Sequence, residues 1–144
     1  MRIVVDTNIV FSAILNTSSL IGELLFNSED QFDFYSPEFM DVELVKYSTK
    51  LKKAASMNDE QLQIATRQVF NNIHLISNEA ISPEYWMKAY ELTKSIDEKD
   101  TPFVATTLSV KAVLWTGDKK LISGLRKKGF KDILNTKELF QIRE

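Results

Sequence analysis

Short apolar runs alternate along the chain with longer segments in which apolar residues recur every three or four positions. The first run, residues 3–5, is continuous and β-branched, a pattern typical of a strand that is covered on both faces, as in parallel sheets. Further short runs at 32–35, 73–76, 112–115 and 133–134 predict more strands. The chain therefore starts with a central strand and returns to the sheet repeatedly.

The segments between these runs have the periodicity of amphipathic helices. From Pro37 to about Lys53 the apolar positions recur at three and four, so we expect one long helix there. Strands that alternate with helices throughout the chain predict an α/β layer fold with a mainly parallel sheet. The other helices are expected over residues 9–15, 19–27, 58–70, 82–93, 101–110, 121–128 and 136–142.

Capping residues mark where several of these helices begin. Ser36 followed by Pro37 predicts a helix start, because a hydroxyl can cap the helix and proline suits its first turn. Asn58 and Gln61 have the spacing of a capping box, and Thr136 is expected to cap the last helix. The limits of the helices are thus predicted as well as their number.

Composition and charge restrict the class of protein. The chain has 144 residues, of which 44% are hydrophobic and 26% are charged, and its net charge is -2. These values suit one packed domain, expected over residues 1–144, and they exclude a disordered chain or a strongly basic nucleic-acid coat protein. Cysteine is absent, which removes disulfides, thiolate zinc sites and cysteine nucleophiles.

The sequence has neither the pattern of a signal peptide nor that of a membrane span. Asp6 comes before an apolar signal segment could develop, and no run approaches the roughly 20 apolar residues that a transmembrane helix needs. We therefore expect a cytoplasmic protein without a membrane partner.

Two acidic residues follow expected strands directly. Asp6 ends the first strand and Asp118 comes shortly after a later one, and open α/β sheets bind ligands beyond the carboxyl ends of their strands. An acid at the end of an apolar core strand is poorly solvated unless it is paired, hydrogen-bonded or bound to metal. A purely structural role for Asp6 and a helix cap for Asp118 are the alternatives.

Two further acids are candidates for the same site. Glu43 is spaced with the apolar face of its expected helix, so it points inward, although a salt bridge or a position at the edge of that face also explains it. Asp97 and Asp100 precede the helix expected from Thr101, for which Asp100 is alternatively the cap. A parallel sheet can bring all these carboxylates to one edge.

Grouped carboxylates need a proton or a cation. Two carboxylates about 4 Å apart repel by roughly 4 kcal/mol at an effective dielectric constant near 20. Ligands that are all oxygen favour Mg²⁺ or Mn²⁺ over zinc. Such a site suits phosphodiester hydrolysis, in which the metal activates water and stabilises the leaving oxygen.

Other chemistries are disfavoured by what the sequence lacks. Glycine occurs only at positions 22, 117, 124 and 129, so neither a dinucleotide-binding fingerprint nor a phosphate-binding loop is present. The one histidine, His74, lies in an expected strand, where a structural imidazole is the better interpretation. A Ser-His-Asp triad would depend on this residue and lacks the usual nucleophile turn.

Four segments carry a resemblance to a known family. They are Val5-Asp6-Thr7-Asn8, Ser36-Pro37-Glu38 leading to Glu43, Asp97-Glu98-Lys99-Asp100-Thr101-Pro102-Phe103, and Thr116-Gly117-Asp118-Lys119. In this order they resemble the PIN-domain nucleases over essentially the whole chain, which implies a three-layer α/β/α sandwich with a central, mainly parallel sheet. The ending Asn135-Thr136-Lys137-Glu138-Leu139-Phe140 is similar to the PIN subgroup of toxins from toxin-antitoxin pairs.

The resemblance also implies an activity and roles for residues. It implies a Mg²⁺- or Mn²⁺-dependent ribonuclease whose acidic, metal-binding cluster is Asp6, Glu43, Asp100 and Asp118, with Asp97 as an auxiliary metal ligand. Asn8 and Thr116 are then polar supports that hold the carboxylates or a bound water. The sequence departs from relatives around Asp100, where Lys99 and Thr101 stand in place of additional acids.

Partners are likewise implied by the resemblance: an RNA substrate, a small antitoxin protein and a second copy of the chain in a homodimer. Basic residues could grip RNA phosphates, although solvated helix faces explain them equally well. Tyr85 and Trp86 could stack on bases or belong to the core. The alternative to the nuclease is a catalytically weak or inactive PIN-fold module that binds RNA or protein. The basic residues are Lys46, Lys50, Lys52, Lys53, Lys119, Lys120, Arg126, Lys127, Lys128 and Lys131.

Overall fold

A parallel sheet forms the centre of the computed structural model, which describes residues 1–143. The strand order is β3-β2-β1-β4-β5, and every neighbouring pair is parallel, so the expected fold class is confirmed. The bounds of the strands are β1 Arg2–Val5, β2 Asp33–Pro37, β3 Ile73–Ile76, β4 Val113–Trp115 and β5 Ile133–Leu134.

The first strand lies in the middle of the sheet, as its continuous apolar run predicts. Ile3 pairs with Phe34 of β2 on one side and with Val113 of β4 on the other. Ile3, Val4 and Val5 are fully buried, because helices cover both faces of the sheet at this point.

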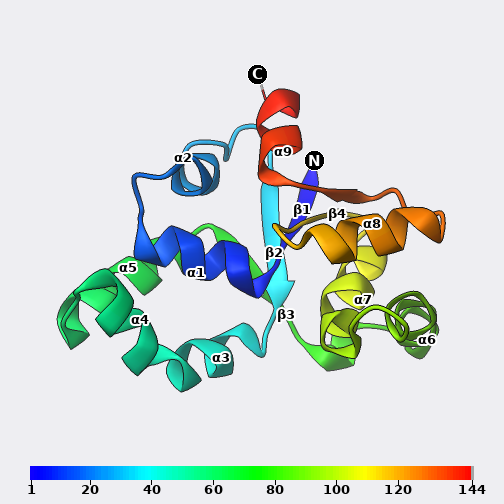
Figure 1. Cartoon of the computed structure of the whole chain (residues 1–144), viewed down its shortest axis with the longest axis horizontal. Helices are drawn as coiled ribbons and strands as arrows, with labels where there is room; N and C mark the ends of the chain where they lie inside the picture. Colours follow the sequence, from blue (N-terminus) through cyan, green and yellow to red (C-terminus); the bar gives the residue numbers. More distant parts are fainter. Residues whose placement is uncertain (144) are drawn as a thin grey trace.

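The helices form two outer layers, which Figure 1 shows to the left and the right of the sheet. Segments that lead from β1 through β2 to β3 lie on one face, and segments that lead from β3 through β4 to β5 lie on the other, as right-handed crossovers require. On the first face are α1 Thr7–Leu15, α2 Leu20–Phe26, α3 Met40–Lys46, α4 Ser48–Ala55 and α5 Asp59–Phe70, and α9 Thr136–Ile142 packs against α2. On the second face are α6 Pro83–Thr93, α7 Thr101–Ser109 and α8 Lys119–Lys127.

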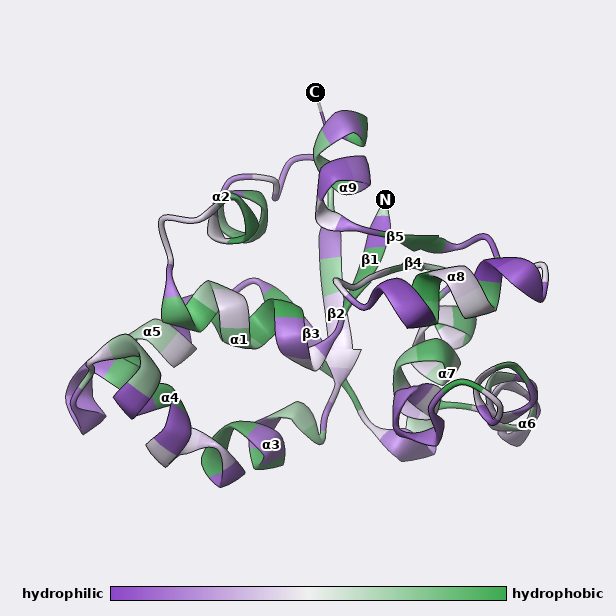
Figure 2. Ribbon diagram, viewed as in Figure 1, coloured by the Kyte–Doolittle hydropathy of each residue, from purple (hydrophilic) through white to green (hydrophobic). Residues whose placement is uncertain are grey.

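The core fills the space between the sheet and these two layers. Apolar residues dominate α1 on one face and α7 on the other (Figure 2). Trp115 is fully buried at the end of β4, where its indole N–H donates to the hydroxyl of Thr136 over 3.0 Å. This bond ties the start of α9 to the sheet.

Two predictions for the segment after β2 are wrong. Ser36 and Pro37 end β2 instead of starting a helix: Pro37 pairs with Ile76 of β3 and lies beyond the last pair that β2 makes with β1. A proline is tolerated there because its missing N–H interrupts no ladder to β1. The hydroxyl of Ser36 donates to the carbonyl of Val5 over 3.0 Å instead of capping a helix.

The long helix expected from Pro37 to Lys53 is in fact two helices. α3 begins at Met40, and the chain leaves regular helical geometry at Tyr47, where α4 follows. The apolar spacing runs through both helices, so the pattern alone does not reveal the break.

The helix caps were predicted with mixed success. Asn58 and Gln61 form the expected capping box of α5. Thr136 does not cap α9: it is the first residue of the helix, and Asn135 caps it in a capping box with Glu138. The Thr136 hydroxyl instead accepts the bond from Trp115. Two short 3₁₀ helices, Asn78–Ala80 and Glu98–Asp100, were not anticipated.

Within residues 1–143 no single helix is long and apolar enough to cross a membrane. Among the described helices, only α1 and α2 taken together reach the length and apolar composition of a membrane span, and the two helices are bent by 102° relative to each other.

Candidate active site at the centre of the sheet

The sheet has a switch point between β1 and β4, where successive connections leave toward opposite faces. α1 follows β1 on one face and α8 follows β4 on the other. Ligands of open α/β sheets bind in the crevice that such a divergence creates beyond the strand ends. Asp6 and Asp118 stand at this point, as the sequence predicts, since each is the residue before its helix.

Asp6 is nearly buried, with 6% of its surface exposed. Its Oδ1 accepts the backbone N–H of Ile9 over 2.9 Å and so caps α1, and its Oδ2 accepts a short hydrogen bond from the Thr116 hydroxyl. Burial raises the pKa of Asp6 above its ordinary value, the two hydrogen bonds oppose that rise, and the charge of Asp118 adds to it. The capping role of Asp6 was not anticipated, although it explains part of how its carboxylate is stabilised.

Thr116 connects the two acids at the switch point. Its hydroxyl donates to Asp6 and accepts the backbone N–H of Asp118 over 3.1 Å. The Oδ1 of Asp118 accepts the N–H of Leu121 over 3.1 Å, which confirms the cap of α8 that the sequence suggested. Capping uses one oxygen of Asp118, so it does not exclude a second role for this carboxylate.

Asp100 is the most perturbed acid of the site. Burial, followed by the charges of Asp97, Asp118 and Asp6, raises the pKa of Asp100 to about 7. Asp100 occupies the N-cap position of α7, as the alternative proposed, but its side chain makes no capping hydrogen bond. Its Oδ2 is buried without a hydrogen-bond partner. This is the kind of oxygen that a bound cation or a donor from a ligand would satisfy.

Asp97 lies within electrostatic reach of Asp100, but its carboxylate has a local task. Its Oδ1 accepts the backbone N–H of Lys99 over 3.0 Å and caps the short helix Glu98–Asp100. This turn carries Asp100 toward the switch point. Asp97 therefore acts on Asp100 both through its charge and through the backbone.

Glu43 stands somewhat apart from the other acids. It is half-buried on α3, and its charge is not among those that shift the pKa of Asp6 or Asp100. With Thr7 and Asn8 it lines a cavity of about 380 Å³ beside α1. Glu43 forms no ion pair with any other residue in the described part of the chain, 1–143.

The acids suit a hard divalent cation by their chemistry. Their donors are carboxylate oxygens, which Mg²⁺ and Mn²⁺ prefer, and the unpartnered Oδ2 of Asp100 lies among them. In the described part of the chain, however, no group of three or more Asp, Glu or His side chains is close enough to hold an ion without rearrangement. Asp6, Asp97 and Asp118 thus lie close enough to Asp100 for their charges to act on it, and Glu43 lies at the neighbouring cavity.

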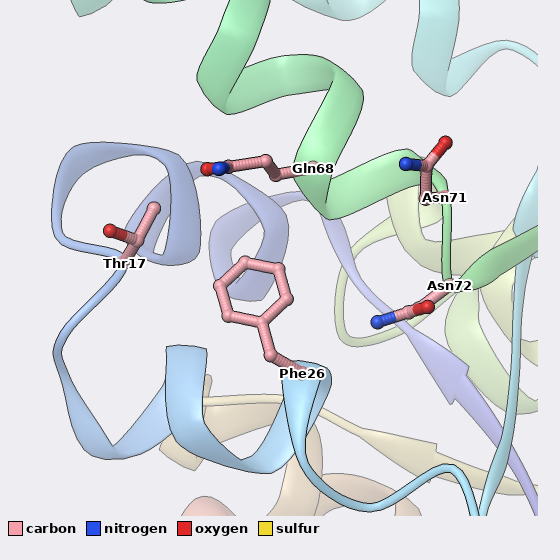
Figure 3. A pocket seen from close by; sticks show the side chains of 5 residues that line it. All are labelled: Thr17, Phe26, Gln68, Asn71 and Asn72. Atoms are coloured by element: carbon pink, nitrogen blue, oxygen red, sulfur yellow. The ribbon is translucent and has the colours of Figure 1, made fainter.

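Another hollow lies at the opposite edge of the sheet. Figure 3 shows the ring of Phe26 among the side chains of Thr17, Gln68, Asn71 and Asn72, which line this pocket with it. Asn71 and Asn72 directly precede β3, at the amino ends of the parallel strands. The pocket is therefore separate from the acids.

Several polar and aromatic candidates have structural roles. His74 lies in β3 with its ring 5.2 Å from that of Tyr35, and Tyr85 and Trp86 pack against the core. Among the bases, Arg126 pairs with Glu138, and Lys128 donates to carbonyls at the end of α6. These contacts favour the structural interpretation of these residues.

Comparison with known proteins identifies the class that this fold and site define. The PIN domain family model matches residues 4–138, so the chain belongs to the PIN domain family, whose members are typically metal-dependent nucleases. An uncharacterized protein of Methanocaldococcus jannaschii is 28% identical over 126 residues, which cover 85% of this chain and 74% of that protein.

A solved structure has the same fold. It is a chain of VapBC2 from Rickettsia felis, crystallised with a DNA fragment from their promoter. The match has a TM-score of 0.64 and 18% sequence identity, and it covers 94% of this chain and 98% of that one.

Proposed function

We propose that this PIN domain is a metal-dependent endoribonuclease that hydrolyses phosphodiester bonds of RNA. The observation that carries the proposal is the unpartnered, buried Oδ2 of the half-buried Asp100 beside the acids of the switch point. Burial and the charges of Asp97, Asp118 and Asp6 raise the pKa of Asp100 to about 7, which agrees with this geometry. Such a group is costly for stability and is expected where a cation and chemistry need it.

Asp6, Asp100 and Asp118 would hold Mg²⁺ or Mn²⁺, with Asp97 and Glu43 as further ligands. When bound, the metal activates water and offsets the charge that develops on the phosphate. Thr116 fixes the orientation of the Asp6 carboxylate through its hydroxyl, and Asn8 lies at the mouth of the adjoining cavity, where it can contact the RNA or a ligand water.

Cleavage of structured and single-stranded RNA with Mg²⁺ or Mn²⁺ tests the proposal. Native protein should cut, and Asp6→Asn and Asp118→Asn should lose most of the activity, because each loses a charged ligand. Asp30→Asn, at an exposed position in the loop before β2, is the matched control and should cut like the native protein. Equal cutting by all four proteins would assign the activity to a contaminant. RNA binding without cutting would favour the alternative, a catalytically inactive binding module.

The proposal extends to partners. The structural neighbour is a toxin-antitoxin complex, which supports a toxin of such a pair as the biological role, with a small antitoxin protein and a homodimer as partners in the cytoplasm. A small open reading frame adjacent to the gene, whose product suppresses RNA cleavage when the two proteins are mixed, is the expected finding. Sedimentation of the purified chain tests the homodimer.

A further inference from the structure

The cavity beside the acid site extends along α1. Thr7, Asn8, Phe11 and Leu15 line it from α1, and the opposite side comes from α3, α4 and the junction between them. Thr7 and Leu15 are eight positions apart in α1, a length of about 12 Å along the helix. Thr7 and Asn8 directly follow the buried Asp6 in the chain, so this end of the cavity adjoins the residue that carries one of the acids.

Two aromatic rings form a wall of the cavity. Phe11 and Tyr47 meet edge to face with their centroids 5.7 Å apart, and both side chains are only half-buried. Leu51 and Ala54 add apolar surface beside them. Such a wall suits a flat ligand that places a ring against an aromatic side chain.

Basic residues surround the aromatic wall. Lys50 lines the cavity, and the Nζ of Lys46 lies over the Tyr47 ring, 5.4 Å from its centre. A base that stacks on this face of the ring displaces the flexible Lys46 side chain. Lys52, by contrast, forms an ion pair with Asp59, so its charge is already compensated. Lysines beside an aromatic side chain are the combination with which proteins bind single-stranded nucleic acids.

We propose that this cavity binds one unpaired nucleobase of single-stranded RNA, stacked on Tyr47, while Lys50 contacts an adjoining phosphate. The inference rests on the proposed function and adds to it a nucleobase site formed by residues of α1, α3 and α4. The base and the scissile phosphate are then held by neighbouring parts of one surface. A paired base cannot enter, because its faces and its edge are already occupied within the duplex.

Fluorescence of a short single-stranded RNA with one 2-aminopurine tests the proposal. Ca²⁺ replaces Mg²⁺ and Mn²⁺ so that binding is measured without cutting, and the titration is repeated in EDTA. Native protein should quench the fluorescence on binding. Tyr47→Leu, which keeps the apolar packing against Phe11, should weaken binding on the order of 10-fold and remove the quenching.

Tyr90→Leu is the matched control. Tyr90 lies on α6, on the opposite face of the sheet, and is 45% exposed, so this variant should bind and quench like native protein. Thermal unfolding and circular dichroism show whether Tyr47→Leu is folded. Equal binding and quenching by native protein and folded Tyr47→Leu overturn the proposal, as does equal quenching of a duplex that contains the same labelled base.

A second variant tests the phosphate contact. Affinity falls with salt concentration, and the steepness of log affinity against log salt concentration reflects the number of phosphate contacts. Lys50→Ala should make this slope shallower by about 1, the value for one contact, whereas Lys88→Ala on α6 should leave the slope unchanged. An unchanged slope in Lys50→Ala removes that lysine from the proposal.

The outcomes separate this proposal from the nuclease itself. If native protein cuts RNA and Tyr47→Leu binds, quenches and cuts equally well, only the nucleobase cavity is wrong. If binding depends on Tyr47 but no metal supports cutting, the cavity is supported and the nuclease proposal fails.

Discussion

The three acids at the switch point all precede helices, but they use that position differently. Asp6 and Asp118 each give one oxygen to a backbone N–H in the first turn of the following helix, and Asp100 gives none. The positive end of a helix lowers the energy of a nearby carboxylate, which compensates part of its burial. Asp100 lacks this hydrogen bond, and its carboxylate is the one whose pKa reaches about 7.

The sequence indicated part of this arrangement. It placed Asp6 directly after one strand and Asp118 shortly after another, because the ends of strands are readable from apolar runs. It could not show that the Thr116 hydroxyl reaches a carboxylate 110 residues earlier, since this contact exists only once β1 and β4 pair. Nor could it show which oxygen of Asp100 is left without a partner, because side-chain rotamers depend on the packed surroundings.

Replacing Thr116 by valine removes the hydroxyl and keeps the shape of the side chain. We expect the free energy of unfolding at neutral pH to fall by about 1–3 kcal/mol, because the buried Asp6 carboxylate loses a donor. The loss should shrink in acid, where Asp6 is protonated. Urea unfolding at several pH values measures it. Thr49→Val, at an exposed position of α4, should show neither effect.

Asp100→Asn should change how stability depends on pH in the absence of metal. The folded pKa of about 7 lies above the ordinary value of 3.8, so the folded protein binds the proton more tightly, and stability falls as the pH rises from about 4 to about 7. The amide does not titrate, so the variant should have a higher melting temperature than native protein at pH 8. At pH 5 this difference in melting temperature should be smaller. Asp30→Asn should retain the native slope; a native slope in Asp100→Asn would contradict the assigned burial.

At the scale of elements, most strands and helices follow from local patterns, and the failures occur where a distant partner decides. Pro37 reads as the first residue of a helix, but pairing with Ile76 extends β2 through it. The break at Tyr47 is hidden within a continuous apolar period, and it places this ring against Phe11 of α1. Both failures lie in the segment between β2 and α4, which carries Glu43.

The close approach of α2 to the preceding loop makes a prediction about Gly22. A Cβ on Gly22 would lie 2.3 Å from the carbonyl oxygen of Thr17, which is backbone and cannot rotate away. Gly22→Ala should therefore destabilise the fold by about 1–3 kcal/mol, although alanine favours helices by about 1 kcal/mol. Gly117→Ala meets no atom within 4 Å and should change the melting temperature little. Equal melting of both variants in a thermal scan would contradict the close contact.

At the scale of the whole molecule, the site is assembled by the topology. Asp6 and Asp118 lie near each other because β1 and β4 are neighbours while their helices diverge, and the turn before α7 brings Asp100 within electrostatic reach of both. No local segment of the chain contains the site. Global stability and occupancy of the site are therefore linked.

Divalent metal should raise the melting temperature of the native protein. A ligand at 100 times its Kd stabilises the folded state by about 2.7 kcal/mol, which corresponds to several degrees for a chain of this size. The gain arises because the cation relieves the repulsion among Asp6, Asp100 and Asp118. Differential scanning with Mg²⁺ and Mn²⁺ measures it. Asp6→Asn should respond hardly at all, and an equal shift in both proteins would count against the site.

The central place of β1 has a consequence for synthesis on the ribosome. β1 is translated before β4, which is its neighbour in the sheet, and Asp6 needs a hydroxyl that is encoded 110 residues later. A nascent chain that has reached only β3 has no complete acid group, however well its first layer of helices has formed. The proposed cleavage of RNA therefore requires that the chain has been translated at least through Asp118.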